Sequence, residues 1–173
     1  MKIAVIYKSK YGTTKRYAEW IAEALDASLF EASNISPSQL TNYETVVYGG
    51  GLYAGGIIGV KLVIENPCKS LIVFTVGLAN PDTTDYSKIL EKNFNPELLS
   101  KINVFHLRGG IDYKKLGLAH KGMMALLVKF MVKRIPQEER TSEIQSMLDT
   151  YGKKVDFTDK ATIKPLIDYI HTL

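Results

Sequence analysis

Runs of consecutive apolar residues alternate along this chain with segments in which apolar residues recur every three or four positions. The first pattern is typical of strands that are buried on both faces of a sheet. It predicts strands at residues 2–7, Ala27–Ala32, Tyr43–Gly49, Leu71–Val76 and Ile102–Leu107. The second pattern is typical of amphipathic helices. It predicts helices at Thr14–Leu25, Ile57–Glu65, Thr83–Asn93, Ala119–Ile135, Thr141–Lys153 and Ile163–Ile170.

The alternation of apolar strands with helices defines a fold class. Helices that connect successive buried strands make those strands parallel and cover both faces of the sheet. We therefore predict an α/β protein with a doubly wound, five-stranded parallel sheet. At 173 residues the chain is expected to form one domain, residues 1–173. Ligands of such sheets bind outside the carboxyl ends of the strands, where the strand order reverses.

The loop after the first strand has the composition of an anion site. Its residues lead directly into a predicted helix and are Ser9, Lys10, Tyr11, Gly12, Thr13 and Thr14. The first amides of a helix have no partner within the helix, and the helix dipole favours negative charge there. Hydroxyl groups add donors, and the glycine lets a ligand approach the backbone. We predict a phosphate in this loop. The alternative is an ordinary strand-to-helix turn capped by serine or threonine.

Two familiar phosphate-binding patterns do not fit this sequence. The nucleoside triphosphate loop requires G-x-x-x-x-G-K-[ST], whereas Gly12 is followed by Thr13 and the first glycine is missing. The dinucleotide pattern G-x-G-x-x-G is also missing after the first strand. Gly49, Gly51 and Ala54 do match G-x-G-x-x-A, but they follow a later strand. An apolar strand also occupies the place where the ribose-binding acid is needed.

Two further loops suit a flat aromatic ring. Residues 50–56 are rich in glycine, and their Leu52 or Tyr53 can cover one ring face. Residues 77–82 follow the strand Leu71–Val76 and combine small residues with backbone amides. We expect both loops to meet residues 8–14 at the carboxyl edge of the sheet. The alternative for the glycine-rich loop is a flexible turn whose Tyr53 packs on a neighbouring helix.

The segment Ser9–Thr14, which follows an N-terminal strand, resembles the phosphate loop of flavodoxins with its pattern of hydroxyl-x-T-G-x-T. Tyr11 stands where that family usually has threonine. The resemblance implies a flavodoxin-like sheet of strand order 2-1-3-4-5 and an FMN cofactor held by the loops after strands one, three and four. The residues then expected to bind FMN are Ser9, Lys10, Tyr11, Gly12, Thr13, Thr14, Gly50, Gly51, Leu52, Tyr53, Ala54, Gly55, Val76, Gly77, Leu78 and Asn80.

The composition is that of a globular protein, but the charge is distributed unevenly. Hydrophobic residues make up 46% and charged residues 23% of the chain, which argues against disorder. The segment from Arg108 to Arg134 contains seven bases and one acid, so it carries +6 while the remainder carries −2. Cys68 is the single cysteine, and the histidines are too scattered to suggest a metal site. Because no secretory signal and no apolar run of about 20 residues is visible, we expect a cytoplasmic protein.

An insert of about 45 residues, from about residue 109 to 153, separates the fifth strand from the last helix. Its helix Ala119–Ile135 is rich in methionine and aliphatic residues and carries Lys121, Lys129 and Lys133 along one side. Such a helix either lies on an anionic membrane or holds an apolar substrate. The alternative is a covering helix that packs on the sheet with its lysines in water.

The segment Leu107–Ile135 resembles the corresponding insert of the menaquinone-dependent protoporphyrinogen oxidases, a flavodoxin-like family. The shared features are Gly109 after the fifth strand, Tyr113 four residues later, and a basic helix that ends in K-x-x-x-K-x-I. The turn Val76–Leu78 also resembles that family, whereas Tyr53-Ala54 stands where the family has an Arg-Tyr pair. This resemblance implies an enzyme that passes electrons from a porphyrinogen to a quinone.

These patterns indicate a redox protein in which the flavin ring carries the chemistry, because no acid–base pair or nucleophile stands out. One hypothesis is an FMN-dependent oxidoreductase that uses a large apolar substrate and a quinone acceptor. The other is a soluble flavodoxin that docks on protein partners. The +6 segment favours the enzyme, since flavodoxin carriers are generally acidic around the flavin. A signalling domain on the same fold needs acids after the first strand, where Lys8-Ser9-Lys10 offers none. We expect no nucleic-acid partner, and peripheral contact with the inner face of a membrane through Ala119–Ile135 stays open.

Overall fold

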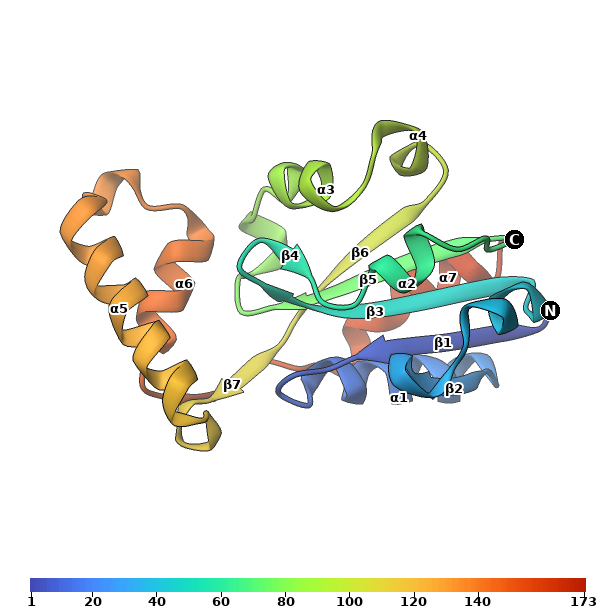
Figure 1. The fold of residues 1–173 in the computed structure, drawn as a ribbon, viewed down its shortest axis with the longest axis horizontal. Coiled ribbons are helices and arrows are strands. Elements are labelled where there is room, and N and C mark those ends of the chain that lie inside the picture. Colours follow the sequence, from blue (N-terminus) through green and yellow to red (C-terminus); the bar gives the residue numbers. More distant parts are fainter.

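A sheet of five parallel strands forms the centre of the computed structural model, which describes the backbone of residues 1–173 and the side chains of all of them except Ala119, Ser142 and Glu143. In order across this sheet the strands are β2 (Ser28–Glu31), β1 (Ile3–Lys8), β3 (Thr45–Tyr53), β5 (Leu71–Gly77) and β6 (Asn103–Arg108). Numbered along the chain, this is the predicted order 2-1-3-4-5. The predicted fold class is therefore confirmed (Figure 1).

The register of the strands brings their carboxyl ends to one edge. Lys8 of β1 pairs with Gly50 of β3, and Gly77 of β5 pairs with Arg108 of β6. Between them, Gly51 of β3 pairs with Val76 of β5. The loops that follow β1, β3, β5 and β6 therefore start side by side.

Helices cover both faces of the sheet because the buried side chains of each strand alternate between the faces. On one face α1 (Thr13–Leu25) and α7 (Lys164–Ile170) pack on residues such as Val5 and Phe74. On the other face lie α2 (Lys61–Ile64), α3 (Ser87–Asn93) and α4 (Pro96–Leu99). Short 3-10 turns occupy Ala32–Asn34, Pro37–Asn42, Pro81–Thr83, Tyr113–Lys115, Gln137–Glu139 and Lys160–Ile163.

The insert leaves and rejoins the fold through a small two-stranded antiparallel sheet. Its strands are β7 (Gly110–Asp112) and β8 (Lys154–Asp156), and between them lie α5 (Leu118–Arg134) and α6 (Ser142–Thr150). Both helices stand beyond the carboxyl edge of the main sheet and cover neither of its faces (Figure 1). The interpretation of the basic helix as a cover packed on the sheet is therefore wrong. No helix in the described part of the chain is long and apolar enough to cross a membrane.

The glycine cluster is the main departure from the predicted elements. Strand β3 continues through Gly49 and Gly50 to Tyr53, and the chain then turns back into β4 (Gly56–Ile57). A Cβ atom at Gly49 would overlap the ring of Phe74, and one at Gly50 would overlap the side chain of Ile57. These two glycines thus permit close packing inside the sheet. Gly49 lies in a strand as predicted, whereas Gly50, which was expected in the loop of residues 50–56, belongs to the strand as well.

Two predicted helices are shorter than expected. The helix predicted at Ile57–Glu65 is reduced to the single turn of α2, because residues up to Ile57 belong to the β3–β4 hairpin. The helix predicted at Thr83–Asn93 starts only at Ser87, because Pro81–Thr83 forms a separate turn.

Candidate functional site

The loop between β1 and α1 presents an uncapped helix N-terminus. Gly12 adopts φ +92°, a left-handed conformation that favours glycine, and α1 starts at the next residue. The amide of Gly12 donates to Ser9 Oγ at 3.0 Å. Within the described residues no side chain caps α1 at Gly12, so the alternative of a serine- or threonine-capped turn is not what this loop adopts. The first amides and the positive end of the dipole of a 13-residue helix are therefore available to an anion.

A narrow crevice of about 70 Å³ joins this loop to its neighbours. The residues that line it come from β3, β5, β7, the loops beside the sheet edge and the start of α1. They are Lys10, Tyr11, Thr13, Thr14, Gly51, Leu52, Ile58, Val76, Gly77, Leu78, Gly109, Gly110 and Ile111. Glycines bring the neighbouring strands close to the threonine hydroxyls. A Cβ at Gly51 would lie 3.3 Å from Thr14 Oγ1, and one at Gly109 would lie 3.0 Å from Thr13 Oγ1.

A larger cavity of about 720 Å³ adjoins the crevice and shares Tyr11, Leu52, Gly77, Leu78 and Ile111 with it. The other residues that line the cavity come from the β3–β4 turn, the α3 region, α5 and α6. They are Tyr53, Ala54, Gly55, Ala79, Thr84, Tyr86, Ile89, Met123, Met124, Leu126, Leu127, Met131, Ile144 and Met147. None of these described lining residues carries a charged side chain. The cavity is therefore an apolar chamber between the sheet edge and the insert.

Cationic side chains lie around the edges of this chamber. Lys10 Nζ lies 3.6 Å from the centre of the Tyr53 ring, close enough for a cation–π contact. Lys92 Nζ donates to the carbonyl oxygen of Ala54 at 2.9 Å. Arg108 Nε donates to the carbonyl oxygen of Leu78 at 3.2 Å. These contacts fix the loops after β3 and β5, and they make the surroundings of the chamber electropositive.

Tyr53 connects the sheet edge to the insert. Its hydroxyl lies 3.3 Å from Met123 Sδ of α5, and its ring makes an edge contact with His120. Tyr53 therefore lines the cavity and also packs on a neighbouring helix, which is the alternative expected for this side chain. The pKa of the nearby Tyr11 hydroxyl is raised, mainly because that side chain is partly buried and to a smaller extent because Tyr53 lies close to it.

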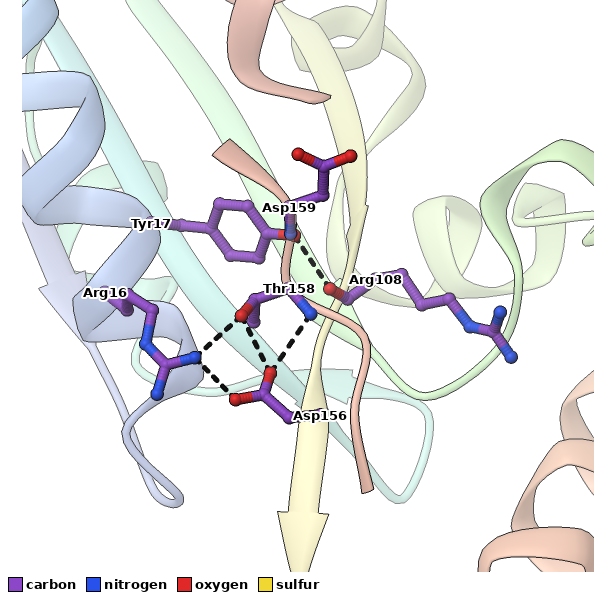
Figure 2. A network of polar contacts seen from close by, with 6 residues as sticks. All are labelled: Arg16, Tyr17, Arg108, Asp156, Thr158 and Asp159. Carbon is purple, nitrogen blue, oxygen red and sulfur yellow. Dashed lines mark hydrogen bonds and ion pairs between the residues drawn. The ribbon is translucent and has the colours of Figure 1, made fainter. Parts of the chain in front are cut away.

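A polar network fixes the returning strand of the insert to α1 (Figure 2). Arg16 Nη1 donates to Asp156 Oδ2 at 2.6 Å and to Thr158 Oγ1 at 2.7 Å. The hydroxyl of Tyr17 donates to the Arg108 carbonyl at 2.8 Å and accepts the Asp159 amide at 3.1 Å. The hydrogen bond from Arg16 is the main reason why the pKa of Asp156 is lowered to about 2. Helix α1 is thereby joined to both ends of the insert.

The structure brings most of the predicted site residues together. Four of them line neither the crevice nor the cavity: Ser9, Gly12, Gly50 and Asn80. Ser9 instead orders the loop through Gly12, and Gly50 is buried inside β3. Asn80 accepts the Asp82 amide at 3.2 Å, and so it caps the following turn.

The sequence prediction missed the part of the lining that comes from α3, β7 and α6. The methionine-rich sequence of the helix predicted at Ala119–Ile135 does indicate an apolar wall, since Met123, Met124 and Met131 line the cavity. Ile144 and Met147 are spaced three residues apart on α6, but nothing in their local sequence indicates a ligand site.

The strand order and the position of the crevice and the cavity define the class of this protein. It is a doubly wound parallel α/β protein whose crevice lies at the carboxyl edge between β1 and β3, where the strand order reverses. The flavodoxin domain family model matches residues 4–136, which include all of the main sheet except Ile3, and helix α5. The chain belongs to the flavodoxin domain family.

Individual relatives are more distant. An uncharacterized protein of Methanocaldococcus jannaschii is 34% identical over 56 residues, which cover 32% of this chain and 37% of that protein. The chain thus spans little more than a third of this relative's length. Among solved structures, flavodoxin 1 from Bacillus cereus has 15% identity and a TM-score of 0.46, and the match covers 79% of this chain and all of that one. A flavoprotein in complex with FMN from Lactobacillus acidophilus has 19% identity and a TM-score of 0.42, with 62% and 91% covered. Because these TM-scores are low, the assignment to the flavodoxin domain family depends on the family-model match and the strand order.

Proposed function

We propose that this protein binds FMN at the carboxyl edge of its sheet and moves electrons through the flavin ring. The adjoining crevice and cavity are the observation that carries this proposal, because they offer an anion site and an apolar chamber next to each other. FMN, when bound, supplies one- and two-electron transfer. The chain itself binds the phosphate, covers the ring and excludes water.

The residues of the first loop fit a phosphate group. The N-terminus of α1 is uncapped in the described residues, the Thr13 and Thr14 hydroxyls border the crevice, and Lys10 adds a positive charge. Glycine at position 12 leaves the approach to these groups open, since no atom lies within 4 Å of a notional Cβ there. A dianionic phosphate would therefore replace water at amide and hydroxyl donors that are already oriented.

The chamber fits a flat, largely apolar ring. Leu52 and Tyr53 on one side and Gly77 and Leu78 on another are lining residues, and backbone amides of the loop after β5 are suited to the polar edge of a flavin. The cations at its margin, Lys10 among them, would favour the negatively charged form of the reduced ring.

The chamber also suits a second apolar molecule. Its volume of about 720 Å³ lies in the upper half of the range of about 300–1,000 Å³ that encloses drug-sized ligands. Methionines of α5 and α6 form much of its wall, and methionine adapts its shape to irregular apolar ligands. We therefore favour an oxidoreductase that takes a large apolar donor of the porphyrinogen type and a quinone acceptor. The alternative is an electron carrier that docks on protein redox partners.

The cofactor proposal is tested on the purified protein. The preparation should be yellow, and acid should release FMN and not FAD. Protein stripped of flavin should quench the fluorescence of added FMN on binding, and Lys10→Gln should weaken that binding about 3- to 10-fold because it removes one favourable charge. A colourless protein that fails to bind added FMN would remove the proposal.

The substrate proposal is tested by filling the chamber. Met131→Trp adds volume inside the lining, and the adjacent Val132→Trp adds the same ring on the exposed surface. Oxidation of protoporphyrinogen with a menaquinone analogue should fall about tenfold or more in the first variant and stay near wild type in the second, since an overfilled pocket loses contacts worth about 1–3 kcal/mol. Equal rates in both variants, with FMN bound, would favour the electron carrier.

A further inference from the structure

Tyr11 belongs to both parts of the candidate site. It comes from the loop between β1 and α1, and it lines the narrow crevice as well as the apolar chamber. Its neighbours Lys10, Thr13 and Thr14 line the crevice alone. The hydroxyl of a tyrosine stands one aromatic ring further from the backbone than that of a threonine. Tyr11 therefore lies where a ligand of the chamber can contact it.

Most of the polar groups in the chamber are engaged within the protein. Among the described lining residues the side chains that carry a hydroxyl are Tyr11, Tyr53, Thr84 and Tyr86. Thr84 Oγ1 donates to the carbonyl oxygen of Asn80 at 2.7 Å. Tyr86 stacks on His106, and the Tyr53 hydroxyl lies 3.3 Å from Met123 Sδ. Three of the four hydroxyl-bearing side chains thus have partners that belong to the chain itself.

The hydroxyl of Tyr11 is different. The Lys10 ammonium lies 5.7 Å from the centre of the Tyr11 ring, and Tyr53 and Tyr113 interact electrostatically with Tyr11. Within the described part of the chain no hydrogen bond engages the Tyr11 hydroxyl. A ligand can therefore accept a hydrogen bond from it without breaking one inside the protein.

The surroundings of Tyr11 keep its hydroxyl a donor at neutral pH. Partial burial and then Tyr53 raise the pKa of Tyr11 above its ordinary value of 10.0. Tyr53 contacts α5 through Met123, and Tyr113 belongs to the small core of the insert. The protonated hydroxyl is thus close to residues that build the insert side of the chamber.

A single free donor in an apolar chamber selects the chemistry of the ligand. Pockets of this kind orient an apolar ligand through a small number of polar groups. A carboxylate would need a cation beside it, and no described lining residue of the chamber carries a charge. A pure hydrocarbon would take water from the hydroxyl and offer no acceptor in return. A flat ring with a neutral carbonyl oxygen meets both requirements.

We propose that the Tyr11 hydroxyl donates a hydrogen bond to a ring carbonyl oxygen of a quinone-class ligand in the chamber. The inference rests on the second ligand advanced under the proposed function. It assigns Tyr11 to that ligand, although its place in the loop is that of a phosphate-binding threonine. Tyr11 is then a residue that determines specificity, because it favours a carbonyl-bearing ring over a hydrocarbon of the same shape.

The test compares two probes that differ in their carbonyl groups. A dimethylated naphthoquinone carries two ring carbonyls, and its blocked ring does not alkylate Cys68; the matching dimethylnaphthalene has the same fused rings and no carbonyl. Equilibrium dialysis of the full chain, FMN-loaded and flavin-free, gives the Kd of each probe without turnover. Wild type should bind the quinone more tightly than the hydrocarbon. Tyr11→Phe should weaken quinone binding about three- to tenfold and change hydrocarbon binding by less than about twofold.

Tyr151→Phe is the matched control. It removes the hydroxyl of an exposed tyrosine that packs on Tyr113 and does not line the chamber, and it should bind both probes like wild type. An unchanged hydrocarbon affinity in Tyr11→Phe shows that the chamber is intact.

Three results would overturn the proposal. Equal losses for both probes in Tyr11→Phe, or an unchanged quinone affinity, would do so and leave the second ligand standing. A loss of FMN affinity with unchanged quinone binding would assign the hydroxyl to the flavin. Failure of wild type to bind either probe would remove the proposed second ligand as well.

Discussion

The imidazole ring of His106 lies flat on the ring of Tyr86, with centroids 3.6 Å apart and an angle of 4° between the planes. His106 Nδ1 and Thr75 Oγ1 are hydrogen-bonded at 2.6 Å, and Thr75 is fully buried. Burial lowers the pKa of His106 to about 4. The histidine is therefore neutral at pH 7 and supports Tyr86, which lines the chamber.

The first prediction concerns the pH dependence of folding. An unfolded histidine has a pKa of about 6.5, so the unfolded state binds more protons than the folded state between pH 6.5 and about 4. The free energy of unfolding should therefore fall as the pH drops through this window, by about 1–3 kcal/mol from His106. Urea unfolding at pH 7 and pH 4.5 measures this loss, and His106→Gln should reduce it. If the free energy of unfolding depended on pH identically in wild type and His106→Gln, the lowered pKa of His106 would not be its cause.

The second prediction compares two tyrosine hydroxyls. Tyr17 makes three hydrogen bonds through its hydroxyl, with the Arg108 carbonyl, the Asp159 amide and the Thr162 hydroxyl. The buried hydroxyl of Tyr113 has no hydrogen-bond partner among the described residues. Tyr17→Phe should therefore lower the free energy of unfolding by about 1–2 kcal/mol. Tyr113→Phe should leave it unchanged or raise it by up to about 1 kcal/mol, because an unsatisfied polar group is removed. Thermal and urea unfolding of both variants measure the difference. A larger loss in Tyr113→Phe would mean that this hydroxyl is satisfied in solution.

The third prediction concerns the contact between Arg16 and Asp156. The pKa of Asp156 is lowered from 3.8 to about 2, so its contribution to stability is complete above about pH 4 and is lost as the pH falls towards 2. Both side chains are over 40% exposed, so this contribution is only about 0.5 kcal/mol. In Arg16→Gln the pKa of Asp156, measured by NMR titration, should rise towards 3.8. Lys15→Gln, on the same helix turn, should leave the titration of Asp156 unchanged.

The fourth prediction tests the close contact within the small sheet. A Cβ at Gly110 would overlap the carbonyl oxygen of Val155 and lie 2.8 Å from the Cα of Asp156. Gly110→Ala should therefore destabilise the protein by about 1–3 kcal/mol. Gly122 lies inside α5 with nothing within 4 Å of a notional Cβ, and Gly122→Ala should stabilise by up to about 1 kcal/mol. Calorimetry on the two variants measures opposite shifts of Tm, and shifts in the same direction would contradict the prediction.

The sequence was sufficient to predict the main sheet because buried parallel strands are continuous apolar runs. It was misleading at Gly50, where glycine can mean either a turn or close packing. The difference depends on Ile57, which belongs to another element. The pair β7 and β8 was missed because three-residue strands show no measurable alternation.

In the candidate site, too, features formed by consecutive residues could be predicted, and contacts between distant segments could not. The loop between β1 and α1 is local, so its composition and its position at a helix N-terminus could be read from consecutive residues, and phosphate binding there stays a prediction. Arg16 and Asp156 are 140 positions apart, and no local pattern pairs them. The contributions of α3 and α6 to the chamber likewise depend on where the folded insert stands.

The pairing of β7 with β8 has a consequence for how this protein can change. Asp112 and Lys154 lie opposite each other, so residues 113–153 leave and rejoin the fold at one pair of adjacent residues. A hairpin turn of two residues is enough to close such a pair. A deletion of residues 113–153 that closes this pair with a short turn would therefore leave every strand of the main sheet in place.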